Sequence, residues 1–158
     1  MVQVFINGFE HRGVSLANYK VNPKHYEFDY CFKRLKESSC KLKWKWLSDF
    51  CNENNVKICI SSVWKNNFKD TDNDWNRTLI NFGFEDGIYV GITGHRQTLR
   101  GDEIKDWMQG KDIESYAIID DDSDMLPEQM SSFFIVDGYY GLTPNIIYRI
   151  GRHFHFYK

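Results

Sequence analysis

The 158-residue chain has few of the features typical of secreted, membrane or polyanion-binding proteins. Its four cysteines (Cys31, Cys40, Cys51 and Cys59) lack the short paired spacing of a zinc knuckle or a redox dithiol. No window holds the run of about 18 apolar residues that spans a bilayer. The formal net charge is −2, so overall charge gives no attraction to nucleic acid or an anionic membrane. We expect no membrane association, while a local basic groove stays open.

The opening residues, MVQVFINGFE, lack both a basic leader and a small-residue cleavage site, so we do not expect a signal peptide. The scattered cysteines favour a reducing cytoplasm, and Cys59 is expected to be a small buried hydrophobe. A content rich in Asn, Lys, Phe and Tyr favours an AT-rich genome. The compositional hypothesis is therefore a protein of the cytoplasm of a bacterial or phage-infected cell.

What is present is a globular composition, with 42% apolar and 16% aromatic residues. A chain of this length supports one well-formed core, so we expect a single domain over residues 1–158. Apolar or β-rich runs predict strands at 2–7, 56–62, 87–93, 114–120 and 131–137. Helical spacing predicts helices at 74–84 and 100–110, one containing Trp44, Leu47, Phe50 and Cys51, and one closing the chain.

The closing helix has a clear start, because Thr143 is a suitable N-cap and Pro144 suits the first turn. Strands that alternate with helices, and are apolar throughout, predict an α/β sandwich around a mostly parallel sheet. In such sheets ligands bind beyond the carboxyl ends of the strands. The predicted strands would thus bring Asn7, the serines Ser61 and Ser62, and an acidic cluster to one crevice.

The acidic cluster lies in YAIIDDDSDM (116–125), where an apolar strand runs directly into Asp120, Asp121, Asp122 and Asp124. Runs of charge are often solvated loops. Carboxylates that follow a buried strand, beside hydroxyl groups and a nearby cation, instead favour a site for Mg²⁺ and a phosphate. We expect Asp122 and Ser123 to face solvent or cap the following turn.

Four motifs together resemble the haloacid dehalogenase (HAD) superfamily, in particular the HAD domain of Swiss Army Knife RNA repair proteins. They are ICISSVWK (58–65), RGDEIKDWM (100–108), YAIIDDDSDM (116–125) and VDGYYGLT (136–143). With the opening strand they follow the family's order over nearly the whole chain. The resemblance implies a HAD-like Rossmannoid three-layer sandwich, and the short excursion after the first strand implies no large cap.

The resemblance also implies site residues. Ser61, with Ser62 as its neighbour, would bind phosphate, and Arg100 would neutralise its charge. Asp120 and Asp121, with Asp124 as a third candidate, would hold Mg²⁺, which reduces the repulsion between a nucleophilic carboxylate and a phosphate. Lys65, Arg96 and Lys111 remain alternatives to Arg100.

The first family motif, a strand that ends in Asp-x-Asp, is absent from VFINGFEH. Counted from the strand, Asn7 takes the place of the nucleophile and Phe9 that of the acid/base; the other register places Phe5 and Asn7 there. An amide cannot form the aspartyl phosphate by the usual route. Glu10 and His11 are nearby but misplaced. Asn7-Gly8 is also prone to deamidation, which would convert some of the Asn7 side chains to aspartate.

The stretch KLKWKW (41–46) places cations beside aromatic rings, a pattern seen in single-stranded nucleic-acid binding. On a helix, however, Lys41 and Lys45 share a face while Trp44 and Trp46 do not, which favours an amphipathic helix with solvated lysines. The five tryptophans are expected to be buried or partly buried. The histidines form no metal-spaced set with the cysteines.

Three functional hypotheses follow. The first is a degenerate HAD-like protein that binds Mg²⁺ and a phosphate-bearing ligand, such as a nucleotide or an RNA end, without normal turnover. The second is a working Mg²⁺-dependent phosphatase on nucleotide or polynucleotide phosphates, with a relocated nucleophile. The third is a protein-interaction module that keeps only the fold, with a protein partner at exposed aromatics of KWKW or GYYG.

Overall fold

The computed structural model describes residues 1–6, 28–29, 32–33, 36, 40–61, 68, 70–94 and 99–157. Asn7, Ser62, Lys65 and Arg96 lie outside this set, as do Phe9, Glu10 and His11. The strands are β1 (Val2–Ile6), β2 (Lys57–Ile60), β3 (Tyr89–Ile92), β4 (Ser115–Asp120) and β5 (Phe133–Ile135). The helices are α2 (Lys41–Asn54), α3 (Thr71–Asn81), α4 (Arg100–Met108), the 3₁₀-helix η4 (Pro127–Ser132) and α5 (Pro144–His153).

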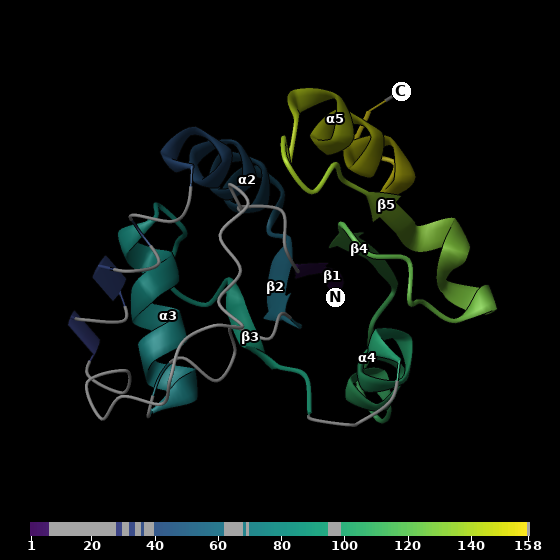
Figure 1. Cartoon of the computed structure of the whole chain (residues 1–158), viewed down its shortest axis with the longest axis horizontal. Helices are drawn as coiled ribbons and strands as arrows, with labels where there is room; N and C mark the ends of the chain where they lie inside the picture. The colour runs from purple at the N-terminus through teal and green to yellow at the C-terminus, as the bar shows by residue number, and fades with distance from the viewer. Residues whose placement is uncertain are drawn as a thin grey trace.

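The five strands form one sheet in the order β3-β2-β1-β4-β5, and every neighbouring pair is parallel (Figure 1). β1 is the central strand. Its last residue, Ile6, pairs with Ile60 on one side and with Ile119 on the other. The predicted parallel α/β arrangement is therefore confirmed. In the described part of the chain no element forms a large cap.

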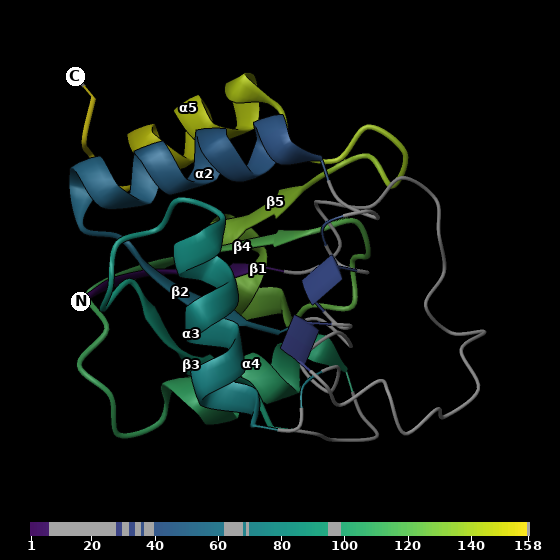
Figure 2. The ribbon, with the colours of Figure 1, turned by 90° about the vertical axis from the view of Figure 1, so that its left-hand side faces the viewer.

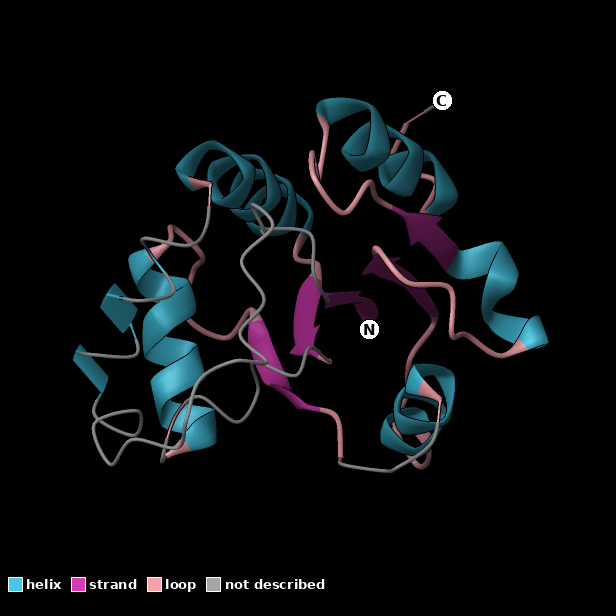
Figure 3. Cartoon of the chain, in the orientation of Figure 1, coloured by secondary structure: helices cyan, strands magenta, loops and turns pink. Residues whose placement is uncertain are grey.

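Helices cover both faces of the sheet, which gives the three layers (Figures 2 and 3). One face packs against α2, α3 and α5 through a large apolar cluster that includes Trp44, Trp75 and Ile150. The other face packs mainly against α4, where Phe5, Cys59 and Ile118 meet Ile104 and Met125. Successive residues of a strand point to opposite faces, so a strand between two helix layers must be apolar at consecutive positions.

The helix ends agree with the local sequence signals. α5 begins as expected, because the Thr143 hydroxyl accepts a hydrogen bond from the Ile146 N–H at 3.4 Å and Pro144 occupies the first turn. α2 ends at Asn55, whose backbone is left-handed (φ 52°), a conformation that Asn tolerates. Cys59 is fully buried, as predicted. No described helix is long and apolar enough to cross a membrane.

Two elements differ from the sequence prediction. The strand expected over 131–137 is only three residues long, because Ser131 and Ser132 belong to η4. η4 itself was not predicted. It is held by Gln129, whose side-chain oxygen accepts from the Leu126 N–H at 3.0 Å while its Nε2 donates to the Gly101 carbonyl at 2.9 Å. This contact to α4 is non-local, so a periodicity pattern does not contain it.

Candidate functional site

The carboxyl edge of the sheet brings together the ends of β1, β2 and β4, the three central strands. The Ser61 N–H donates to the Ile6 carbonyl at 3.1 Å, so Ser61 continues the pairing of β2 with β1. Asp120 is the last residue of β4 on the other side of β1. Ser61 and Asp120 therefore flank the point where β1 leads into Asn7, which itself lies outside the described residues.

Ser61 is fully buried, and its hydroxyl has no hydrogen-bond partner among the residues that the structure describes. A buried hydroxyl without a partner costs about 1–3 kcal/mol. Most buried polar side chains are paired, so an exception calls for an explanation such as a bound ligand. The position, at a strand end on the carboxyl edge, is where ligands bind in parallel sheets.

Arg100, the first residue of α4, is anchored beside Ser61. Its guanidinium Nη1 donates to the Ser61 carbonyl oxygen and, at 3.0 Å, to Oε2 of Glu103. The Thr93 hydroxyl, directly after β3, donates to the same Glu103 oxygen at 3.5 Å. In this ion pair the Arg100 side chain is only 15% exposed and the Glu103 side chain only 6% exposed. A cation is thus held at the carboxyl edge by a buried carboxylate.

Sequence reasoning missed Glu103 and Thr93. The signal for Glu103 was present, because it lies three residues after Arg100 on a predicted helix and so shares its face. Lys111, an alternative to Arg100, lies beyond the other end of α4. Its ammonium donates to the Trp107 carbonyl at 2.6 Å and lies 4.0 Å from the centre of the Trp107 ring.

The four carboxylates of the acidic cluster have different environments. Asp120 is fully buried, and its Oδ1 accepts from the Asp122 N–H at 3.0 Å. Asp121 is exposed and lies against Gly138, where a Cβ would come 3.3 Å from its Oδ2. Asp122 is exposed and accepts from the Ser123 N–H at 2.7 Å, as expected for a residue that caps the turn.

Asp124 is bound to α4. Its Oδ2 accepts from the Arg100 N–H at 3.1 Å, and its carbonyl accepts from the Gly101 N–H at 3.1 Å. The residue before α4, Leu99, offers no side-chain cap, so the cap comes from Asp124 in the loop after β4. A carboxylate at a helix N-terminus also interacts favourably with the helix dipole.

The described residues supply only a few ligands for a magnesium ion. Within the described ranges no three His, Cys, Asp or Glu side chains gather as a metal-binding group. Mg²⁺ that is bound with a phosphate, however, commonly uses one or two protein carboxylates, with water and phosphate oxygens completing the shell. Asp120 and Asp121, consecutive at the end of β4 on the same edge of the sheet as Ser61, match that donor set, while Asp124 already caps α4.

A tight turn follows β5 at the same edge. Asp137 bridges to Gly141, and its Oδ1 accepts from the N–H groups of Tyr139 and Tyr140 at 2.8 Å each. These N–H groups, that of Tyr140 first, lower the pKa of the Asp137 carboxyl. The turn exposes both tyrosines, at 72% and 68%, so GYYG is a surface feature, whereas Trp44 of KWKW is buried.

The sheet order and the helix layers define a Rossmann-like α/β domain. A profile of the family described as "HAD domain in Swiss Army Knife RNA repair proteins" matches residues 16–146. The match covers most of the chain, so the protein belongs to this family. β1 and Asn7 precede the matched range. Searches of curated proteins and of solved structures gave no significant match.

Proposed function

We propose that this protein is a degenerate HAD domain that binds a phosphate-bearing ligand at the carboxyl edge of its sheet without normal phosphatase turnover. The observation that carries the proposal is the buried hydroxyl of Ser61, which has no hydrogen-bond partner in the described part of the chain, beside the anchored guanidinium of Arg100. A phosphate oxygen accepts hydrogen bonds from hydroxyl groups and from cationic side chains. The ligand class is a nucleotide or an RNA end.

Each residue of the edge has a distinct role in this proposal. The Ser61 hydroxyl donates a hydrogen bond to a phosphate oxygen. Arg100 supplies positive charge, and Glu103 holds its guanidinium against the end of β2. Asp120 and Asp121 would hold Mg²⁺, which would neutralise phosphate charge when bound. Ser62 is a further candidate phosphate ligand by its sequence position.

The absence of turnover follows from the first motif. Asn7 follows β1, where the family's nucleophile would be, and a side-chain amide is not a nucleophile for phosphoryl transfer. A carboxylate from elsewhere in the chain cannot replace it without loss, because displacement by about 1 Å can cost a hundredfold in rate. Binding without catalysis is the activity that remains.

The test combines binding and turnover on freshly purified protein, since deamidation of Asn7-Gly8 would place an aspartate at the nucleophile position in part of the sample. Inorganic phosphate and a nucleoside monophosphate are titrated calorimetrically with and without Mg²⁺. Hydrolysis of an aryl phosphate is followed with wild type, Asn7→Asp and Asp120→Asn. Melting temperatures of all variants verify that they are folded.

We expect the wild type to bind phosphate and to be inert, Asn7→Asp to gain Mg²⁺-dependent activity, and Asp120→Asn to lose the magnesium dependence of binding. Wild-type turnover that disappears in Asp120→Asn would instead establish the active phosphatase. Absence of phosphate and magnesium binding would contradict the ligand part of the proposal and favour the protein-interaction module.

A further inference from the structure

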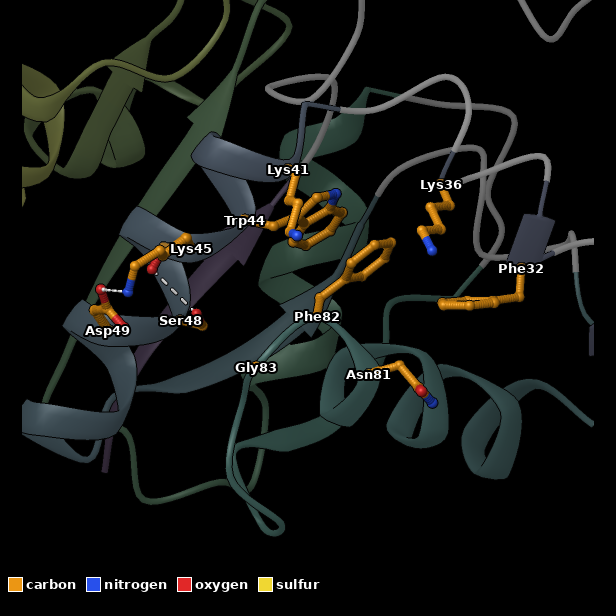
Figure 4. A pocket seen from close by; sticks show the side chains of 10 residues that line it. All are labelled: Phe32, Lys36, Lys41, Trp44, Lys45, Ser48, Asp49, Asn81, Phe82 and Gly83. Atoms are coloured by element: carbon orange, nitrogen blue, oxygen red, sulfur yellow. Dashed lines mark hydrogen bonds and ion pairs between the residues drawn. The ribbon is translucent and has the colours of Figure 1, made fainter.

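A cavity of about 480 Å³ opens between α2 and the end of α3, on residues that take no part in the carboxyl-edge site (Figure 4). This volume lies within the range of about 300–1,000 Å³ typical of small-molecule pockets. Three aromatic residues and three lysines contribute to its lining: Phe32, Trp44, Phe82, Lys36, Lys41 and Lys45.

The aromatic part of the lining belongs to a row of contacting rings. The Phe82 ring lies parallel to Trp44, with a centroid distance of 4.5 Å and an interplanar angle of 3°. Phe32 lies 5.6 Å from Phe82 with its ring tilted by 43°, and it stacks on Phe28. Trp44 is buried, whereas Phe82 and Phe32 are only partly covered. The exposed parts of the two phenylalanine rings are therefore the aromatic surface that a ligand can reach.

The wall that carries Phe82 is fixed to α2 by hydrogen bonds. Asn52 donates from Nδ2 to the Gly83 carbonyl at 2.8 Å and accepts from the Glu85 N–H at 2.9 Å. Gly83, with φ of 106°, also packs closely on Ser48, where a Cβ would come within 3.1 Å of the hydroxyl oxygen. This wall of the cavity is thus preformed, which lowers the ordering cost of binding.

The charged lining residues that the structure describes are mainly positive. Asp49, the one carboxylate among them, pairs with Lys45 at 2.8 Å. Lys36 and Lys41 are exposed and make no ion pair with any described residue. Figure 4 shows Lys41 beside Trp44 and Lys36 across the opening, with Phe82 between them. Two cations thus stand on opposite sides of an aromatic surface.

We propose that this cavity binds a nucleotide unit of a single-stranded nucleic acid, with its base stacked on the exposed part of Phe82, beside Phe32, and its phosphate between Lys36 and Lys41. Sites for single-stranded nucleic acids typically combine aromatic rings, on which any base can stack, with cationic side chains that contact the phosphate backbone. Inorganic phosphate would not use the rings, and an uncharged apolar ligand would not use the lysines. The KLKWKW pattern alone favoured solvated lysines; the proposal gives one of them, Lys41, a role in binding phosphate.

The test is a fluorescence-anisotropy titration of a labelled short single-stranded RNA, repeated at several salt concentrations. The double variant Lys36→Glu/Lys41→Glu removes the cations, and Phe82→Leu removes the stacking surface while keeping an apolar side chain against Trp44. Arg152→Glu, an exposed charge reversal on α5, is the matched control. The RNA carries no terminal phosphate, so it does not offer the carboxyl-edge site the phosphate-bearing end proposed for that site.

We expect the double variant to bind at least about tenfold more weakly and with a smaller salt slope, since each lost phosphate contact on a single strand lowers that slope by roughly 0.7. Phe82→Leu should lose about tenfold, while Arg152→Glu should bind like wild type. Undetectable RNA binding by wild type, or equal binding by the double variant, would overturn the proposal. Displacement of the RNA by an equimolar polyglutamate peptide would overturn the base-stacking part, because charge alone would then suffice.

Discussion

The carboxylate of Asp124 accepts a hydrogen bond from the backbone N–H of Arg100, so the loop after β4 caps the helix whose first side chain reaches the end of β2. The acidic cluster and Arg100, the cation of the candidate site, are therefore structurally coupled. Moving the loop would move α4, and with it the guanidinium beside Ser61.

Replacing Ser61 by Ala should weaken phosphate binding about tenfold, because one hydrogen bond to a charged group is lost. The free energy of unfolding should stay the same or rise by up to about 1 kcal/mol, since an unpartnered buried hydroxyl disappears. Calorimetric titration and urea unfolding measure the two effects. Thr78→Val is the matched control, because Thr78 in α3 also has a buried hydroxyl without a partner among the described residues. Loss of phosphate binding in this control would contradict a specific role for Ser61.

Glu103→Gln should lower the free energy of unfolding by about 3 kcal/mol, because it leaves the buried Arg100 guanidinium without its counter-charge. Urea unfolding measures the change. For comparison, Lys105→Gln breaks an ion pair with Glu128 whose side chains are more than half exposed, and such pairs contribute at most about 1 kcal/mol. Equal effects of the two substitutions would mean that the Arg100–Glu103 pair is not buried in solution.

Gly101→Ala should destabilise the protein and disturb the cap of α4. A Cβ at this position would lie 2.5 Å from Oε1 of Gln129 and 2.6 Å from the Leu126 nitrogen, so α4 and η4 would have to separate. We expect a loss of about 1–3 kcal/mol, as for other overpacked sites. Gly94→Ala has open space around its Cβ and should be close to neutral. Thermal unfolding of both variants distinguishes crowding from a general effect of glycine replacement.

The turn at 137–141 should lose its structure in acid. The N–H groups of Tyr140 and Tyr139 lower the folded-state pKa of Asp137 below its ordinary value of 3.8. The turn is therefore stabilised above that value, and the stabilisation disappears as the pH falls through the lower, folded-state pKa. Amide NMR shifts of Tyr139 and Tyr140 should follow this titration, and in Asp137→Asn they should not. Shifts that move together with the whole spectrum would instead report global unfolding.

Most of the fold was predictable from the sequence because its signals are local. The apolar runs around Cys59 and Ile118 indicated strands buried on both faces, and Thr143-Pro144 indicated where α5 begins. η4 was not predictable in this way, because Gln129 fixes it by bonding to Gly101 in another helix. Tertiary contacts of this kind produce no periodic pattern in the sequence.

The candidate site was predictable to a similar extent. Sheet topology alone placed Ser61 and Asp120 at one edge, and the structure confirms that they flank the end of β1. The role of Glu103 and the cap formed by Asp124 depend on side-chain geometry between segments distant in the chain. The metal role of Asp120, Asp121 and Asp124 stays a prediction.

The central place of β1 has a consequence for how the chain acquires its structure. β1 is synthesised before the other described strands, and Ile6 can pair with Ile60 early, but its other partner, Ile119, follows more than a hundred residues after Ile6. Until then one side of a strongly apolar strand has no neighbour. Such long-range parallel pairing slows folding and leaves intermediates open to aggregation. The yield of folded protein during expression should therefore depend more strongly on temperature and on chaperones than the stability of the folded domain predicts.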